Sequence, residues 1–190
     1  MTVTAALVLG GGRATRLGGA DKAAVEIAGV PLVERVYAAV RGLPVIAVGP
    51  PSLARPGVTV VREEPPFGGP VAALAAGVAA LAPGIGEVLV LACDLPRAAG
   101  IVDQLTAAPL PDDADALVLR DAGGRLQWLA ARYRMAPLRR ALAALPAVDG
   151  APMRAVLDGL RFVALDDDRD AALDLDTWAD VEGYRDGYRD

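Results

Sequence analysis

The chain has 190 residues, 54% of them hydrophobic and 23% charged, and this composition excludes a disordered chain, which would combine low hydrophobicity with high net charge. The formal net charge of −5 argues against nonspecific binding to nucleic acid, because such binding needs a broad basic face. Histidine is absent, which excludes Ser-His-Asp and Cys-His catalysis and the common histidine-containing metal sites. We expect a single folded domain over residues 1–190.

The sequence also predicts where the protein works. It has no run of roughly 18 apolar residues that could span a membrane, and its first residues lack the basic start and cleavage site of a signal peptide. Cys93 is the only cysteine, so no internal disulfide can form, which fits a reducing compartment. We therefore expect a cytoplasmic protein that binds neither membrane nor nucleic acid.

Continuous apolar runs typical of buried parallel strands alternate with stretches of helical pattern. In chain order, the predicted elements are a strand at 3–9, a helix at 31–40, strands at 44–49 and 58–61, a helix at 70–81, strands at 88–92 and 116–119, helices at 135–145 and 153–160, and a strand at 162–165. This alternation predicts a three-layer α/β fold with a doubly wound, mostly parallel, Rossmann-like sheet.

Three polar elements follow predicted strands. Glycines 10–12 follow the first strand, Glu63 and Glu64 follow the third, and Asp94 follows the fourth. Ligands of doubly wound sheets bind outside the carboxyl ends of the strands. We therefore expect these three elements to meet at one ligand site.

The loop after the first strand, residues 9–22, reads LGGGRATRLGGADK and ends at Lys22, the only lysine beside 18 arginines. It fits neither the Walker template nor the GxGxxG dinucleotide fingerprint. Its glycines still let the backbone approach a phosphate or a base edge closely, and Arg13, Arg16 and Lys22 supply three cations. The alternative interpretation is a flexible turn with solvated charges.

This loop resembles the signature LxGGxxxRMGxxDK of the molybdenum cofactor guanylyltransferases, a family of nucleotidyltransferases with the glycosyltransferase-A-like fold of nucleotide-diphospho-sugar transferases. Further resemblances follow in family order and span nearly the whole chain. They are 29–32 (GxPL), 69–74 (GPLAGL), 93–96 (CDxP) and 174–177 (NxNT or DxDT).

The resemblance implies a site. Arg16 and Lys22 would contact the nucleotide phosphates, Asp94 would bind Mg²⁺, and these three would be the catalytic residues. An acidic residue before the GPLAGL-like element, Glu64 or Glu63, would help to recognise guanine. The nucleotide contacts implied are Leu9, Gly10, Gly11, Gly12, Arg13, Lys22, Glu64 and Asp94.

The implied reaction joins GMP from GTP to molybdopterin or its molybdenum complex and releases pyrophosphate, with cofactor-assembly proteins as further partners. An acceptor phosphate is already ionised at neutral pH, so the absence of histidine is no handicap. Mg²⁺ prefers few protein carboxylates plus substrate oxygens and water, and a single Asp94 suffices.

Other interpretations stay open at this point. Asp174 and Asp176 replace the asparagines of some family members and would repel an anionic pterin phosphate, which leaves room for another phosphorylated acceptor, cytidylyl chemistry or a noncatalytic nucleotide-binding module. Asp94 could instead cap a following helix. Cys93 fits a small buried packing residue better than a nucleophile.

Overall fold

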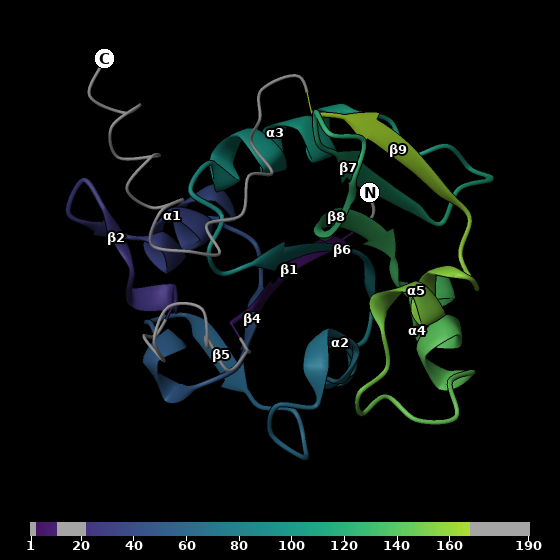
Figure 1. Ribbon diagram of the computed structural model, residues 1–190, viewed down its shortest axis with the longest axis horizontal. Helices are drawn as coiled ribbons and strands as arrows, with labels where there is room; N and C mark the ends of the chain where they lie inside the picture. Colours follow the sequence, from purple (N-terminus) through teal and green to yellow (C-terminus); the bar gives the residue numbers. More distant parts are fainter. Residues whose placement is uncertain (1–2, 11–21, 168–190) are drawn as a thin grey trace.

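The structure is a computed structural model, which describes residues 3–10 and 22–167. Its core is a seven-stranded sheet (Figure 1), with a separate two-stranded sheet of β2 (Glu26–Ile27) and β3 (Val30–Pro31). The strands of the large sheet are β1 (Val3–Leu9), β4 (Val45–Val48), β5 (Val58–Val61), β6 (Ile85–Ala92), β7 (Ala116–Arg120), β8 (Leu126–Arg134) and β9 (Phe162–Asp166).

The large sheet has the strand order β5-β4-β1-β6-β8-β7-β9. β1 pairs in parallel with β4 and β6, β4 pairs in parallel with β5, and β7 pairs in parallel with β9. Within this described sheet only β8 runs antiparallel to its neighbours. The prediction of a doubly wound, mostly parallel sheet is confirmed.

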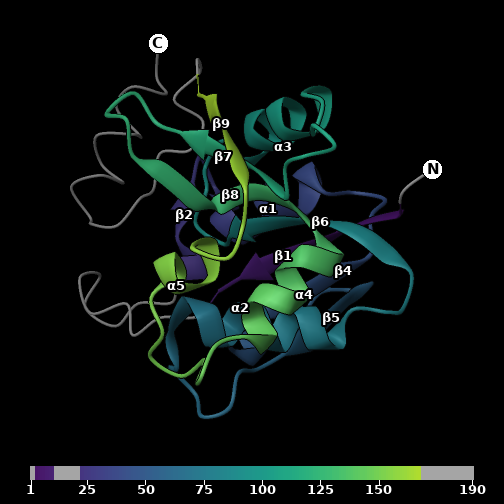
Figure 2. The same cartoon turned by 90° about the vertical axis from the view of Figure 1, so that its right-hand side faces the viewer.

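In the part of the chain that the structure describes, five helices cover the two faces of the sheet. α1 (Leu32–Ala39) and α3 (Ala98–Ala107) lie on one side in Figure 1, and α2 (Gly69–Ala80), α4 (Met135–Ala143) and α5 (Met153–Leu157) lie on the other. Figure 2 shows α4 beside α2, with α5 next to α4. Two short 3-10 helices, η2 (Lys22–Ala24) and η3 (Pro51–Leu53), contact each other.

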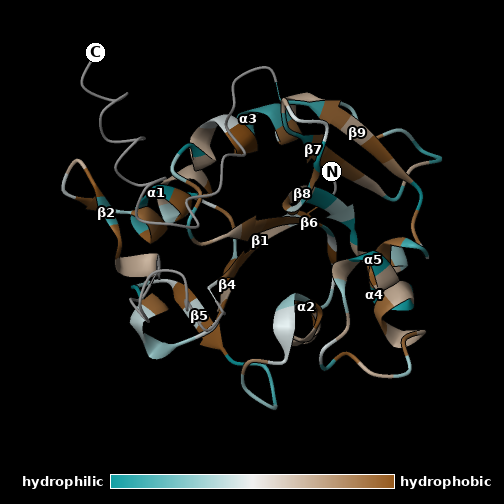
Figure 3. Cartoon of the chain, in the orientation of Figure 1, coloured by the Kyte–Doolittle hydropathy of each residue, from teal (hydrophilic) through white to brown (hydrophobic). Residues whose placement is uncertain are grey.

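The alternation of side chains along β1 explains why helices cover both faces. Ala5, Leu7 and Leu9 pack in the cluster on the α2 side, whereas Ala6 and Val8 pack in the cluster on the α1 side, and all five are buried. Successive strand residues point to opposite faces, so a run that is apolar throughout must be covered twice. Figure 3 shows this hydrophobic colour along β1 and β4.

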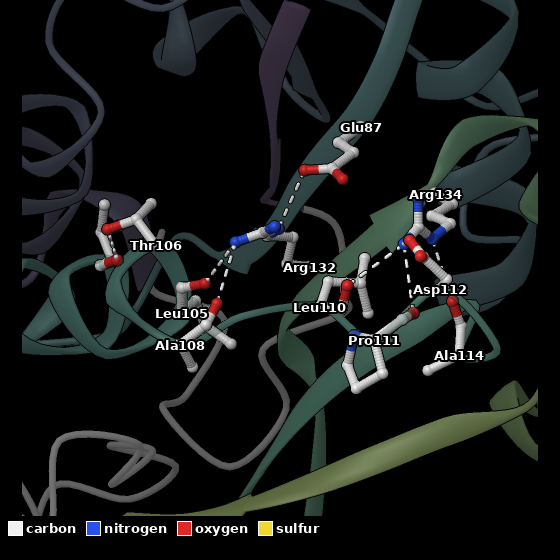
Figure 4. A network of polar contacts seen from close by, with 11 residues as sticks. Glu87, Leu105, Thr106, Ala108, Leu110, Pro111, Asp112, Ala114, Arg132 and Arg134 are labelled. Atoms are coloured by element: carbon white, nitrogen blue, oxygen red, sulfur yellow. Dashed lines mark hydrogen bonds and ion pairs between the residues drawn. The ribbon is translucent and has the colours of Figure 1, made fainter. Parts of the chain in front are cut away.

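Two arginines of β8 bind a carboxylate and backbone carbonyls near the amino ends of the parallel strands (Figure 4). The Arg132 Nε lies 2.9 Å from Glu87 Oε2, and Nη1 donates to the carbonyl of Leu105 at the end of α3. Arg134 donates through Nε and Nη2 to three carbonyls of the loop between α3 and β7, those of Leu110, Pro111 and Ala114. Cationic side chains that satisfy the last carbonyls of a helix stabilise its end.

The sequence prediction missed α3, β8 and the small β2–β3 sheet. β8 reads LQWLAARYR, and its arginines interrupt the apolar pattern because they bind backbone carbonyls on the α3 side. α3 contains Gly100 and Asp103, which interrupt its apolar positions, although Ala98, Ile101, Val102 and Leu105 are buried. Pro31 lies in β3 and forms the N-cap of α1 rather than its first turn.

Among the described residues, no helix is long and apolar enough to cross a membrane.

Candidate active site

The carboxyl ends of four strands are joined by hydrogen bonds that continue past the regular ladders. The residues that follow β1, β4 and β6 therefore lie side by side at one edge of the sheet. The bonds run from Gly10 N to Val48 O (2.8 Å), from Gly49 N to Val61 O (2.9 Å) and from Cys93 N to Leu9 O (3.0 Å).

Two glycines at this edge pack against one leucine. A Cβ on Gly10 would lie 2.5 Å from Leu53 Cδ1, and a Cβ on Gly49, whose φ is +150°, would lie 2.9 Å from the same atom. The hydroxyl of Tyr37 on α1 donates to the Leu53 carbonyl at 2.8 Å and fixes η3 in place. A side chain at Gly10 would require Leu53 to shift, whereas one at Gly49 would also meet the backbone of Gly10, so glycine is needed most at Gly49.

The glycine loop itself lies outside the described residues. Of the predicted nucleotide contacts on it, Leu9 is the buried end of β1 and Gly10 follows directly, whereas Gly11, Gly12, Arg13 and Arg16 are not described. The backbone of Lys22 begins η2, which contacts η3 and α1. The backbone of Lys22 therefore lies at the start of a segment that contacts η3, whose Leu53 packs against Gly10 and Gly49.

Glu63 and Glu64 follow β5 but differ in their surroundings. Glu63 is buried, with 5% of its surface exposed, whereas Glu64 is exposed. The Glu63 Oε1 accepts a hydrogen bond from the backbone N–H of Phe67 at 3.0 Å, and its Oε2 is buried with no hydrogen-bond partner. A buried carboxylate oxygen without a donor is costly, so Glu63 is the stronger candidate for a ligand contact.

Phe67 is a feature that sequence reasoning missed. Its backbone is left-handed, with φ +66°, yet its side chain is 52% exposed and the Arg62 guanidinium lies 5.3 Å from its ring centroid. Left-handed backbone is uncommon outside glycine and concentrates at functional sites. The dipeptide Pro65-Pro66 before it was the available signal, because prolines mark a tight loop.

Asp94 follows β6 and is 7% exposed. The N-cap of α3 is Arg97, so the alternative that Asp94 caps this helix is wrong. Within the described residues, no three histidine, cysteine, aspartate or glutamate side chains gather as metal ligands. A single carboxylate at a strand end fits Mg²⁺, which takes its remaining oxygens from phosphates and water. Cys93 is 3% exposed and packs on the α1 side, as predicted.

The second half of the chain contributes Arg120 to the same edge. Arg120 ends β7 and binds Asp166 of β9 at 2.6 Å, which lowers the pKa of Asp166 through this hydrogen bond. The following turn is held by Asp121, which accepts hydrogen bonds from Arg125 N and Gln127 Nε2. Arg132 belongs to the opposite edge. Asp174 and Asp176 lie outside the described residues.

Comparison with known proteins places this geometry in a family. Residues 6–166 match the model of the MobA-like NTP transferase domain, so the match runs from within β1 through Asp94 to the end of β9. The chain belongs to this family. A molybdenum cofactor guanylyltransferase from Acidiphilium cryptum (strain JF-5) is 32% identical over 195 residues, which cover 96% of this chain and 94% of that protein.

A second relative with the same name, from Serratia proteamaculans (strain 568), is 37% identical over 108 residues. This alignment covers 52% of this chain and 53% of that protein, so the match spans about half the length of each. The crystal structure of molybdopterin-guanine dinucleotide biosynthesis protein A from Archaeoglobus fulgidus has a TM-score of 0.74 at 18% identity, with 98% of this chain and 99% of that chain covered. This likeness shows that the two share a fold.

Membership of the MobA-like family confirms the prediction of a nucleotidyltransferase with the glycosyltransferase-A-like fold. Within such a fold, Gly10, Asp94 and the carboxyl end of β5 share one edge, as the sequence predicted from strand ends alone. The particular roles of the residues at this edge are proposals.

Proposed function

We propose that this protein is a molybdenum cofactor guanylyltransferase, which joins GMP from GTP to molybdopterin or its molybdenum complex and releases pyrophosphate. The observation that carries the proposal is the buried Asp94 at the strand end beside Gly10, in a chain that matches a curated guanylyltransferase over nearly its full length. Residues 1–190 are taken as one nucleotidyltransferase domain.

The reaction forms a bond between an acceptor phosphate oxygen and the α-phosphorus of GTP, and it breaks the bond from this phosphorus to the oxygen that leaves with pyrophosphate. The acceptor oxygen is already ionised at neutral pH, so no general base is needed. The protein has to position two anionic substrates and to stabilise charge on the leaving group. Lys22 and Arg16 are proposed to contact the phosphates.

Asp94 is the residue proposed to hold Mg²⁺, and its burial beside the phosphate site supports this role. When bound, Mg²⁺ would supply positive charge to the phosphate oxygens. Asp94 would orient that charge because it follows a buried strand, whose register with β1 is unbroken over six residue pairs, Thr4↔Glu87 to Leu9↔Ala92.

Glu63 is proposed to recognise guanine, in preference to Glu64. The guanine edge offers a ring N–H and an amino group, both donors, and a buried carboxylate oxygen accepts from them. Oε1 of Glu63 is engaged by Phe67, which leaves Oε2 for the base. The exposed Phe67 ring belongs to the same short loop and could provide a face for a planar ligand.

The test is pyrophosphate release by the purified protein with Mg²⁺ and molybdopterin or its molybdenum complex, measured separately with GTP, CTP and ATP. We expect release with GTP. Release with CTP, or only with another phosphorylated acceptor, would assign a different nucleotidyltransferase reaction. GTP binding without release for any acceptor would point to a noncatalytic nucleotide-binding module.

A further inference from the structure

Strand β8 is irregular beside the carboxyl end of β6. Its ladder with β7 passes from the pair Val118–Ala131 directly to the pair Leu119–Gln127. β8 therefore advances four residues, from 131 to 127, while β7 advances one, so three residues of β8, 128–130, have no β7 partner. Bulges of this kind bend a strand and are frequent next to active sites.

The side chains of this bulge confirm the irregularity. Trp128 and Leu129 are consecutive, yet both pack against the hydrophobic cluster on the α2 side of the sheet. Consecutive residues of a regular strand point to opposite faces. The bulge therefore turns one of these side chains back onto the face that the other occupies.

The bulge lies level with the metal-binding candidate. The β6–β8 ladder ends at the pair Leu91–Ala130, whereas β6 continues to Ala92 and the chain then reaches Asp94. A regular β8 would have continued beside these residues. The ladder with β8 instead ends at Leu91, three residues before Asp94.

Two contacts hold the bulge in this shape. The hydroxyl of Tyr133, which is fully buried, donates to the carbonyl of Trp128 at 2.9 Å. The Trp128 ring packs edge-to-face on Phe162 of β9, with 5.1 Å between ring centroids. Since an unpaired buried carbonyl is costly, the Tyr133 hydroxyl stabilises the bulged backbone directly.

The strand order gives this bulge a role. β1, which carries the glycine loop, lies on one side of β6, and β8 lies on the other. An in-line displacement puts the acceptor on the side of the α-phosphorus away from pyrophosphate. We infer that the bulge at 128–130 forms the acceptor side of the crevice, and that Tyr133 is a positioning residue for the phosphorylated pterin. This inference rests on the proposed function.

The test compares two tyrosines whose hydroxyls each hold one backbone carbonyl. Tyr133→Phe frees the Trp128 carbonyl on the acceptor side, and Tyr37→Phe frees the Leu53 carbonyl under Gly10 and Gly49. Initial rates are measured with GTP and molybdopterin varied in turn. We expect Tyr133→Phe to raise the KM for molybdopterin about tenfold and to leave the KM for GTP within about twofold, and Tyr37→Phe to do the reverse.

If the Tyr133→Phe protein does not fold, a second variant tests the same bulge. Phe162→Leu removes the ring contact with Trp128 at a half-exposed edge position, and we expect a smaller rise in the same KM. Equal changes in both KM values, or no change in either, would overturn the role of the bulge while the wild type still turns over. A wild type that binds GTP but transfers to no acceptor would overturn the proposed function and this inference together.

Discussion

The backbones of Gly10 and Gly49 are in contact: a Cβ on Gly49 would lie 3.0 Å from the Gly10 carbonyl carbon and 3.1 Å from its oxygen. Backbone atoms at a strand end cannot move aside as a flexible side chain can. We expect Gly49→Ala to displace the start of the glycine loop and to weaken GTP binding at least tenfold, as measured by titration calorimetry.

Gly42→Ala is the matched control. Gly42 has φ +89°, so alanine there is also strained, but nothing lies within 4 Å of its Cβ position and it precedes β4 at the opposite edge of the sheet. Both variants should lose about 1 kcal/mol of stability from the left-handed backbone. Unchanged GTP affinity in both would contradict the role of the Gly10–Gly49 contact.

Glu63→Gln tests the recognition of guanine. Glutamine keeps an oxygen for the Phe67 N–H but replaces Oε2 with an amino group, which is a donor facing the donors of guanine. We expect about tenfold weaker GTP binding and a smaller preference for GTP over ATP, because hydrogen bonds to charged groups contribute about 1.5–3 kcal/mol.

Glu64→Gln provides the comparison, since Glu64 is exposed. It should bind GTP within about twofold of the wild type, in line with the small effects of most surface substitutions. A larger loss in Glu64→Gln than in Glu63→Gln would restore Glu64 as the ligand that the family resemblance implied.

The order of elements was predictable where hydrophobicity alone decides it. The predicted strands matched Val3–Leu9 and Val58–Val61, because each is an apolar run interrupted by a single threonine. β8 was not predictable in this way. Arg132 serves there as a partner for Glu87 and for a helix end, and such a role depends on contacts between segments far apart in the sequence.

The residues of the candidate site also differ in how far the sequence could predict them. Asp94 and Gly10 could be placed at one edge because each follows a buried strand. The choice of Glu63 over Glu64 could not be made, since the two are adjacent and only the path of the loop decides which is buried. The left-handed Phe67 also depends on this path, because Pro65-Pro66 marks a tight loop but does not determine the sign of φ at the phenylalanine that follows.

Asp94→Asn should reduce kcat at least a hundredfold, because a neutral amide holds Mg²⁺ more weakly than a carboxylate. Pyrophosphate release at saturating GTP measures the effect. Cys93→Ala is the adjacent control: it removes a buried packing residue, so it should lower the melting temperature and keep kcat within about threefold. A large loss of kcat in Cys93→Ala would mean that the thiol takes part in the chemistry.

Arg132→Met should destabilise the fold by about 3–5 kcal/mol, because it leaves the buried Glu87 carboxylate without its partner. The double variant Arg132→Met with Glu87→Leu should recover part of this loss, since an apolar pair needs no desolvated charge, while the carbonyls of Leu105 and Ala108 still lack their donor. Denaturant unfolding measures both. The pair lies at the amino edge, so the double variant should keep its KM for GTP; a variant that loses GTP binding would place this pair in the site.

The free energy of unfolding should fall at alkaline pH because Tyr37 is buried. Desolvation raises the pKa of Tyr37 from 10.0 to about 12, and the nearby Arg55 opposes part of this rise. Because the folded-state pKa lies above the unfolded one, the contribution to stability is complete below about pH 10 and is lost as the pH rises toward 12. Denaturant unfolding between pH 9 and 12, taken at roughly half-unit steps, should show this loss in the wild type and a shallower one in Tyr37→Phe. Equal slopes in the two proteins would mean that the Tyr37 hydroxyl ionises as freely in the folded state as in the unfolded chain, and would contradict the desolvation that raises its pKa.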